Sequence, residues 1–112
     1  MDKRRFCLTL NLKNDPILIQ EYEKYHQNVP EVIAQSFQDA GILSMEIYRW
    51  ENRLFMIMEV SEDFSFEKKK ELDESNPKVL EWEALMSRFQ EPIQENNPSE
   101  KWVLMKQIFK TS

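Results

Sequence analysis

The only histidine of the chain, His26, lies in a segment whose residue types suit proton transfer. Tyr22 precedes His26 by four residues, so on a helix the two side chains share one face. Pro30 follows at the same spacing and ends a helix there, because it lacks an N–H and its ring crowds the carbonyl group of His26. The helix dipole favours a protonated imidazole at such a C-terminus. The segment predicts either an ordinary boundary histidine or a small acid/base site.

A second candidate is Trp82, which has two interpretations. A single tryptophan at helical spacing usually packs in a core. The functional interpretation is a flat apolar platform for the C–H face of a sugar. Trp50, Trp102 and Cys7 are interpreted as packing residues.

The composition excludes several classes of function. The 112 residues fit one domain, 1–112, and the single glycine excludes the glycine-rich loops of nucleotide sites. A net charge of −5 argues against nucleic acid as a partner. One histidine and one cysteine cannot form a clustered metal site, and no cofactor is expected. No apolar run has the length of a membrane span, and a lone cysteine fits a reducing compartment, so a cytoplasmic protein without membrane contact is predicted.

Hydrophobic periodicity predicts the elements that position these residues. Alternation predicts strands, and spacings of three and four residues predict helices. In chain order we expect a strand at 4–12, a helix from Pro16 that breaks at Pro30 and continues to Gly41, strands at 43–50 and 53–60, a short helix within 62–75, a helix from Pro77, a loop at 92–100 and a strand at 101–109.

Local signals support the helix boundaries. Asp15 before Pro16, and Asn76 before Pro77, are typical of a helix N-cap followed by proline at the first helical position. Gly41 stands where a glycine commonly ends a helix.

This β–α–β–β–α–β order predicts an α+β fold, a ferredoxin-like sandwich. Its helices cover one face of a four-stranded sheet. The strands at 53–60 and 101–109 are nevertheless apolar on both faces. A homodimer whose sheets face each other would bury the second face, giving a dimeric α/β barrel.

Over essentially its whole length the chain resembles the L-rhamnose mutarotase family. The resemblance rests on the Tyr22-x-x-x-His26 pair, the Pro30-Glu31 dipeptide that follows it, and a set of residues further along the chain: Gly41, Ile47-Tyr48, Asn52, Leu54-Phe55, Glu59, Trp82 and Met86. It implies a small dimeric isomerase that interconverts the α and β anomers of a free deoxy-hexose. It also implies that His26 is the proton donor and that Tyr22 and Trp82 contact the substrate.

The chain departs from the family pattern at positions that concern the sugar rather than the reaction. Met45 stands where the family has a substrate-contacting tyrosine, Glu83 replaces the second of two paired tryptophans, and Val29 replaces a tryptophan before the proline. Met45 and Glu83 are therefore further candidates for substrate contact. The resemblance implies L-rhamnose or a related 6-deoxy-hexose as substrate, with L-fucose as the rival.

Other interpretations stay open at this stage. The general base is a bound water, Tyr22 or a carboxylate. A different dimeric α/β-barrel enzyme, such as a small monooxygenase, predicts a pocket of apolar side chains. A non-catalytic ligand-binding module predicts an exposed His26 with no pocket around it.

Overall fold

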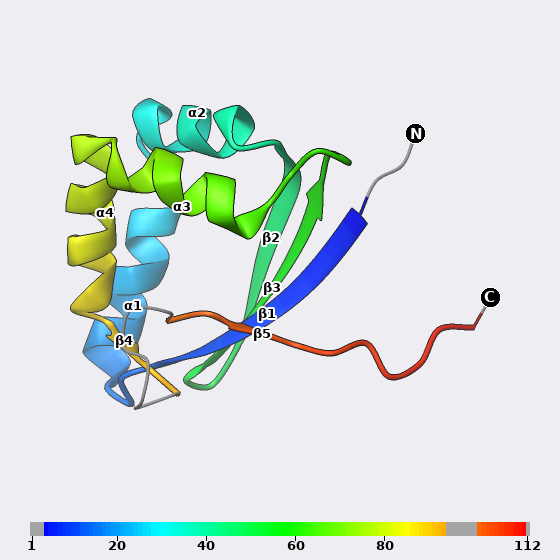
Figure 1. Cartoon of the computed structure of the whole chain (residues 1–112). Helices are drawn as coiled ribbons and strands as arrows, with labels where there is room; N and C mark the ends of the chain where they lie inside the picture. Colours follow the sequence, from blue (N-terminus) through cyan, green and yellow to red (C-terminus); the bar gives the residue numbers. More distant parts are fainter. Residues whose placement is uncertain (1–3, 94–100, 112) are drawn as a thin grey trace.

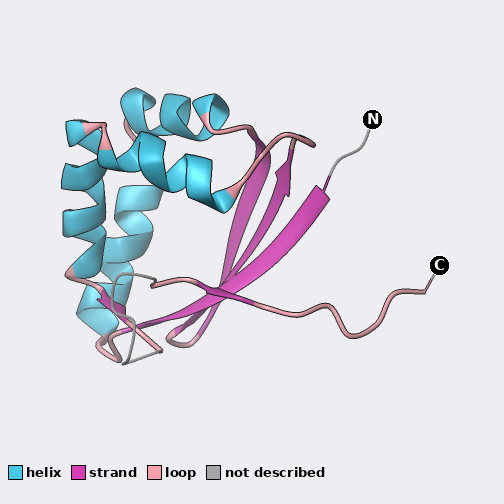
Figure 2. Cartoon of the chain, in the orientation of Figure 1, coloured by secondary structure: helices cyan, strands magenta, loops and turns pink. Residues whose placement is uncertain are grey.

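The computed structural model describes residues 4–93 and 101–111 and shows one antiparallel sheet with helices on one side (Figures 1 and 2). The elements in chain order are β1 (Arg4–Leu12), α1 (Pro16–His26), α2 (Glu31–Asp39), β2 (Ile42–Trp50), β3 (Arg53–Val60), α3 (Phe66–Glu74), α4 (Pro77–Ser87), β4 (Gln90–Glu91) and β5 (Val103–Leu104). The sheet order is β2-β3-β1-β4, and β5 also pairs with β1. The predicted ferredoxin-like fold is confirmed.

The helix boundaries are those that the capping residues predict. The Asp15 side chain accepts hydrogen bonds from the backbone N–H groups of Ile17 and Leu18. Asn76 caps α4 in the same manner through the N–H of Lys78. The first helical region does break before Pro30, since α1 ends at His26 and α2 begins at Glu31.

Strand register separates the sheet into two different faces. Met58 of β3 pairs with Phe6 and Met45, so these three side chains lie on the face that the helices cover. The other β3 residues of this face are also buried, whereas Phe55 and Ile57 on the opposite face are only half-buried.

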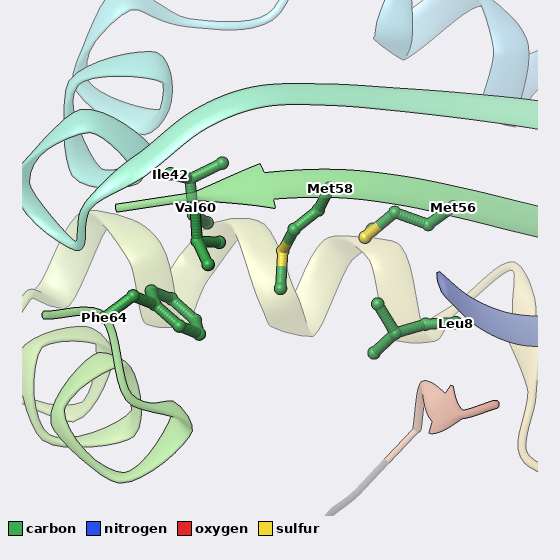
Figure 3. Packing of buried hydrophobic residues seen from close by; sticks show 6 residues of the cluster. All are labelled: Leu8, Ile42, Met56, Met58, Val60 and Phe64. Atoms are coloured by element: carbon green, nitrogen blue, oxygen red, sulfur yellow. The ribbon is translucent and has the colours of Figure 1, made fainter. Parts of the chain in front are cut away.

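Two clusters of buried residues fill the space between sheet and helices. The first core cluster is Leu8, Ile42, Met56, Met58, Val60 and Phe64 (Figure 3). The second core cluster is Leu12, Tyr22, Leu54, Met86 and Phe89. Trp102 packs against both clusters, in agreement with its interpretation as a packing residue.

The prediction of a long last strand is wrong beyond Leu104. Only Val103–Leu104 pairs with β1, and residues 105–111 form no regular structure and extend away from the body of the molecule (Figure 1). Ile108 and Phe109 are 89% and 76% exposed, so no part of the described chain covers them. Sequence periodicity also missed β4, whose two residues are too few to show alternation. Most of the predicted loop at 92–100 lies outside the described residues.

Trp50 also differs from its interpretation as a packing residue. It is 75% exposed, at the end of β2 on the sheet face that the helices do not cover. Tyr48, on the same face, is exposed as well. The open face of the sheet therefore carries a row of aromatic and aliphatic side chains.

Candidate functional site

The last turn of α1 holds the two residues that the sequence singled out. Tyr22 and His26 lie on one face of the helix, with 4.4 Å between their ring centroids. Tyr22 is buried in the second core cluster, while His26 is half-buried. The helix ends at His26, so the imidazole lies at the C-terminal end of α1, beside the backbone carbonyl groups of its last turn.

A backbone contact fixes which imidazole nitrogen can exchange a proton. His26 Nδ1 lies 2.9 Å from the carbonyl oxygen of Tyr22. Because a carbonyl oxygen only accepts, Nδ1 must carry the hydrogen in this contact. In a neutral imidazole Nε2 then holds the free lone pair, and in the charged form it holds the second proton. Of the two ring nitrogens, Nε2 is therefore the one that is free to exchange a proton.

Trp82 of α4 completes the group. Its ring meets the imidazole of His26 edge to face, with 5.8 Å between centroids, and it packs against the second core cluster. The packing interpretation and the platform interpretation of Trp82 are thus both compatible with its position. Two helices far apart in the sequence thus place Trp82 beside His26, which in turn packs against Tyr22.

The phenol of Tyr22 is held in its neutral form. Burial raises the pKa of Tyr22 to about 12, a hydrogen bond from Gln90 partly opposes this rise, and the negative charge of Glu83 adds to it. At neutral pH Tyr22 is a hydrogen-bonding group and a poor base. The geometry therefore disfavours one of the three candidates for the general base.

Gln90 is a site residue that sequence reasoning missed. It lies on β4, is 5% exposed, and its Nε2 donates a hydrogen bond of 3.4 Å to the hydroxyl of Tyr22. Nothing in the sequence marked it, because a single polar residue after a helix has no periodicity or motif. Only the packing of β4 beside α1 and β1 brings it to Tyr22.

Of the other two predicted substrate contacts, Glu83 lies near Tyr22, whereas Met45 packs against the first core cluster. Met45 is half-buried on the helix-covered face of β2 and packs against the first core cluster. Its neighbour on that face, Ile47, packs against both clusters. Glu83 is close enough to Tyr22 to affect its pKa, and its carboxylate lies 3.3 Å from the ammonium group of Lys101.

A hollow at the surface lies apart from His26, between the start of α1 and the turn that joins β2 to β3. Its volume is about 480 Å³, and its lining is mostly polar: Asn14, Pro16, Ile19, Gln20, Glu23, Arg49, Glu51 and Asn52. Two of its lining residues, Arg49 and Glu23, form an ion pair. Among the described residues there is no group of three His, Cys, Asp or Glu side chains that could hold a metal ion. No described helix is both long and apolar enough to cross a membrane.

Comparison with known proteins gives consistent results. Residues 5–111 match the model of the L-rhamnose mutarotase family. The chain is 42% identical to an L-fucose mutarotase of Xanthomonas campestris pv. campestris, over all of this chain and 91% of that protein. It is 36% identical to a UPF0734 protein of Dictyostelium discoideum, over 96% of this chain and 90% of that protein. The crystal structure of an L-rhamnose mutarotase from Formosa agariphila has the same fold, with a TM-score of 0.72 at 19% identity, over 97% of this chain and 99% of that one.

Proposed function

Because this chain belongs to the L-rhamnose mutarotase family, we propose that its substrate is a free 6-deoxy-hexose whose α and β anomers it interconverts. Family membership favours a mutarotase over the small monooxygenase and the non-catalytic module. Between the two candidate sugars, the 42% identity to an L-fucose mutarotase favours L-fucose, while the family model favours L-rhamnose. L-fucose is therefore the first substrate to test, with L-rhamnose beside it.

The contact between His26 and Tyr22 carries the proposed mechanism. Protonated His26 donates the proton on Nε2 to the ring oxygen of the sugar, while a base removes the proton of the anomeric hydroxyl. The bond between C1 and the ring oxygen breaks, which gives the open-chain aldehyde and a neutral imidazole. Rotation about the C1–C2 bond turns the other face of the carbonyl group to the oxygen. The reverse proton transfers then close the ring as the other anomer, and the imidazole recovers its proton.

The remaining roles follow from position. Tyr22, with a neutral phenol, donates a hydrogen bond to the substrate, and the indole of Trp82 packs against the C–H face of the sugar. Met45 and Glu83 are proposed to contact the sugar on the side where they replace residues of the family pattern. The base is a bound water or a carboxylate, because a phenol with a pKa of about 12 accepts no proton in this step.

We also propose that the protein is a cytoplasmic homodimer of one mutarotase domain, residues 1–112. The support for a dimer is the open sheet face, with Tyr48, Trp50, Phe55 and Ile57, and the extended segment that carries the exposed Ile108 and Phe109. A second copy packed against this face would bury these side chains by a two-fold contact.

The decisive experiment measures anomer exchange directly. Saturation-transfer NMR on L-fucose and L-rhamnose gives the exchange rate between α and β anomers with and without the protein. The proposal expects exchange well above that of buffer for at least one of these sugars. Exchange no faster than in buffer for every 6-deoxy-hexose tested would show the proposal to be wrong.

A further inference from the structure

The amide of Gln90 is a buried polar group whose hydrogen bonds are incomplete. Its Nε2 donates to the Tyr22 hydroxyl at 3.4 Å. Its Oε1 is fully buried and has no hydrogen-bond partner within the part of the chain that the structure describes. Buried acceptors are almost always paired in folded proteins, and an unpaired one lowers stability. An acceptor in this position indicates that a donor from outside the described residues belongs beside it.

The Tyr22 hydroxyl has the opposite deficit, because it lacks an acceptor rather than a donor. Its oxygen accepts from Gln90, and among the described residues no acceptor is found for its own hydrogen. The pair thus presents one free donor, the Tyr22 O–H, beside one free acceptor, Gln90 Oε1. Flipping the Gln90 amide also leaves one free donor and one free acceptor. In the flipped form Tyr22 donates to Oε1, so Nε2 is the free donor and the phenol oxygen is the free acceptor.

We propose that Tyr22 and Gln90 together form a subsite for one hydroxyl group of the sugar. A hydroxyl donates once and accepts as well, so a single such group satisfies both free positions at once. The phenol ring of Tyr22 spans the distance from the imidazole of His26 to the amide of Gln90, so the subsite lies one side chain away from the proton donor. This inference rests on the proposed function and adds to it a residue, Gln90, that selects sugars by a ring hydroxyl.

The first test replaces the amide by an apolar group of similar length, Gln90→Met. Loss of one substrate hydrogen bond is expected to raise KM about tenfold and to change kcat little. The melting temperature is expected to stay equal or to rise, since the variant removes an unpaired buried acceptor. Gln38→Met, at an exposed position on α2, is the matched control and should leave both quantities unchanged. A lower melting temperature with an unchanged KM would assign Gln90 a structural role only and overturn the inference.

The second test identifies the hydroxyl and does not depend on the Met variant. L-Fucose analogues with the C2, C3 or C4 hydroxyl replaced by hydrogen are compared in the wild-type protein and in Tyr22→Phe. One of these deletions should raise KM in the wild type, and its effect should be absent in Tyr22→Phe and in Gln90→Met. Equal effects of each deletion in all proteins would mean that a water molecule fills the subsite, and the inference would fail.

Sugar binding to the His26→Ala protein tests the subsite separately from the proposed function. It is measured through the shift of the melting temperature that each sugar causes. Sugar binding that depends on Gln90, without anomer exchange in the wild type, would overturn the function and keep the subsite. Anomer exchange in the wild type, together with sugar binding that does not depend on Gln90, would keep the function and overturn the subsite. If no sugar binds at all, both are wrong.

Discussion

The imidazole of His26 packs against the phenol ring of Tyr22, while its Nδ1 lies 2.9 Å from the main-chain carbonyl oxygen of the same tyrosine. One residue thus fixes both the orientation of the histidine ring and the nitrogen that carries the permanent hydrogen. The consequence is that Nε2, on the far side of the ring from this carbonyl group, is the nitrogen available for proton exchange. In this arrangement a single helical turn supplies the positioning that other enzymes obtain from a separate orienting residue.

His26→Ala should lower the rate of anomer exchange by about 100- to 10,000-fold, the range that general acid–base catalysis contributes. Saturation-transfer NMR on L-fucose measures the rate, and far-ultraviolet circular dichroism checks that the variant is folded. Gln38→Ala, at an exposed position on α2, serves as the control and should keep the wild-type rate. Full activity in His26→Ala would remove His26 from the mechanism.

Stability should fall at alkaline pH in a manner that depends on Tyr22. Its pKa lies at about 12 in the folded chain, against 10.0 for an unperturbed tyrosine, because burial disfavours the phenolate. Between these values the unfolded chain loses a proton that the folded chain keeps, so the contribution is complete below pH 10 and is lost as the pH rises toward 12. The loss amounts to about 2–3 kcal/mol, since one unit of pKa corresponds to about 1.4 kcal/mol.

Urea denaturation at a series of pH values tests this prediction, with Tyr22→Phe as the comparison. The unfolding free energy of the wild type, minus that of Tyr22→Phe, should fall as the pH rises above 10. Parallel curves for the two proteins would contradict the burial-induced rise of the Tyr22 pKa.

Gly41→Ala should destabilise the connection between α2 and β2. Gly41 has φ = 91°, a conformation that side-chain-bearing residues rarely adopt, and an added Cβ would lie 2.7 Å from Ser61 Oγ. Backbone strain of this kind costs about 1–3 kcal/mol. Combining Gly41→Ala with Ser61→Ala should recover only the part of the lost stability that comes from the clash with Ser61 Oγ. A urea midpoint unchanged by Gly41→Ala would refute this account of the glycine.

Ile57→Lys should convert the proposed dimer into monomers, because Ile57 lies on the sheet face that the helices leave open. In a two-fold contact the substitution occurs on both protomers, so two lysine charges would be buried in the apolar interface without a partner of opposite charge. Sedimentation velocity measures the mass. Ile17→Lys, at an exposed apolar residue on α1, is the matched control and should stay dimeric. A wild-type monomer, or a dimeric Ile57→Lys protein, would exclude this face as the interface.

The sequence by itself determined the elements whose signals are local. Asp15 and Asn76 begin helices because their side chains accept backbone N–H groups a few residues away, and Pro30 ends α1 because a proline cannot donate. The same helical spacing that predicted a shared face for Tyr22 and His26 is what brings their rings together. In β1 and β2 alternation was sufficient to predict a strand, and the order of strands and helices then predicted the fold.

Only the tertiary structure decided the features that depend on contacts between distant segments. Gln90 meets Tyr22 across 68 residues of sequence, and no local pattern encodes that meeting. Residues 101–109 form an apolar strand pattern in the sequence, yet β1 pairs only with Val103 and Leu104 of this range. A strand is stable only where a neighbouring strand and an apolar surface both contact it, and within the described residues nothing pairs with or covers Ile108 and Phe109.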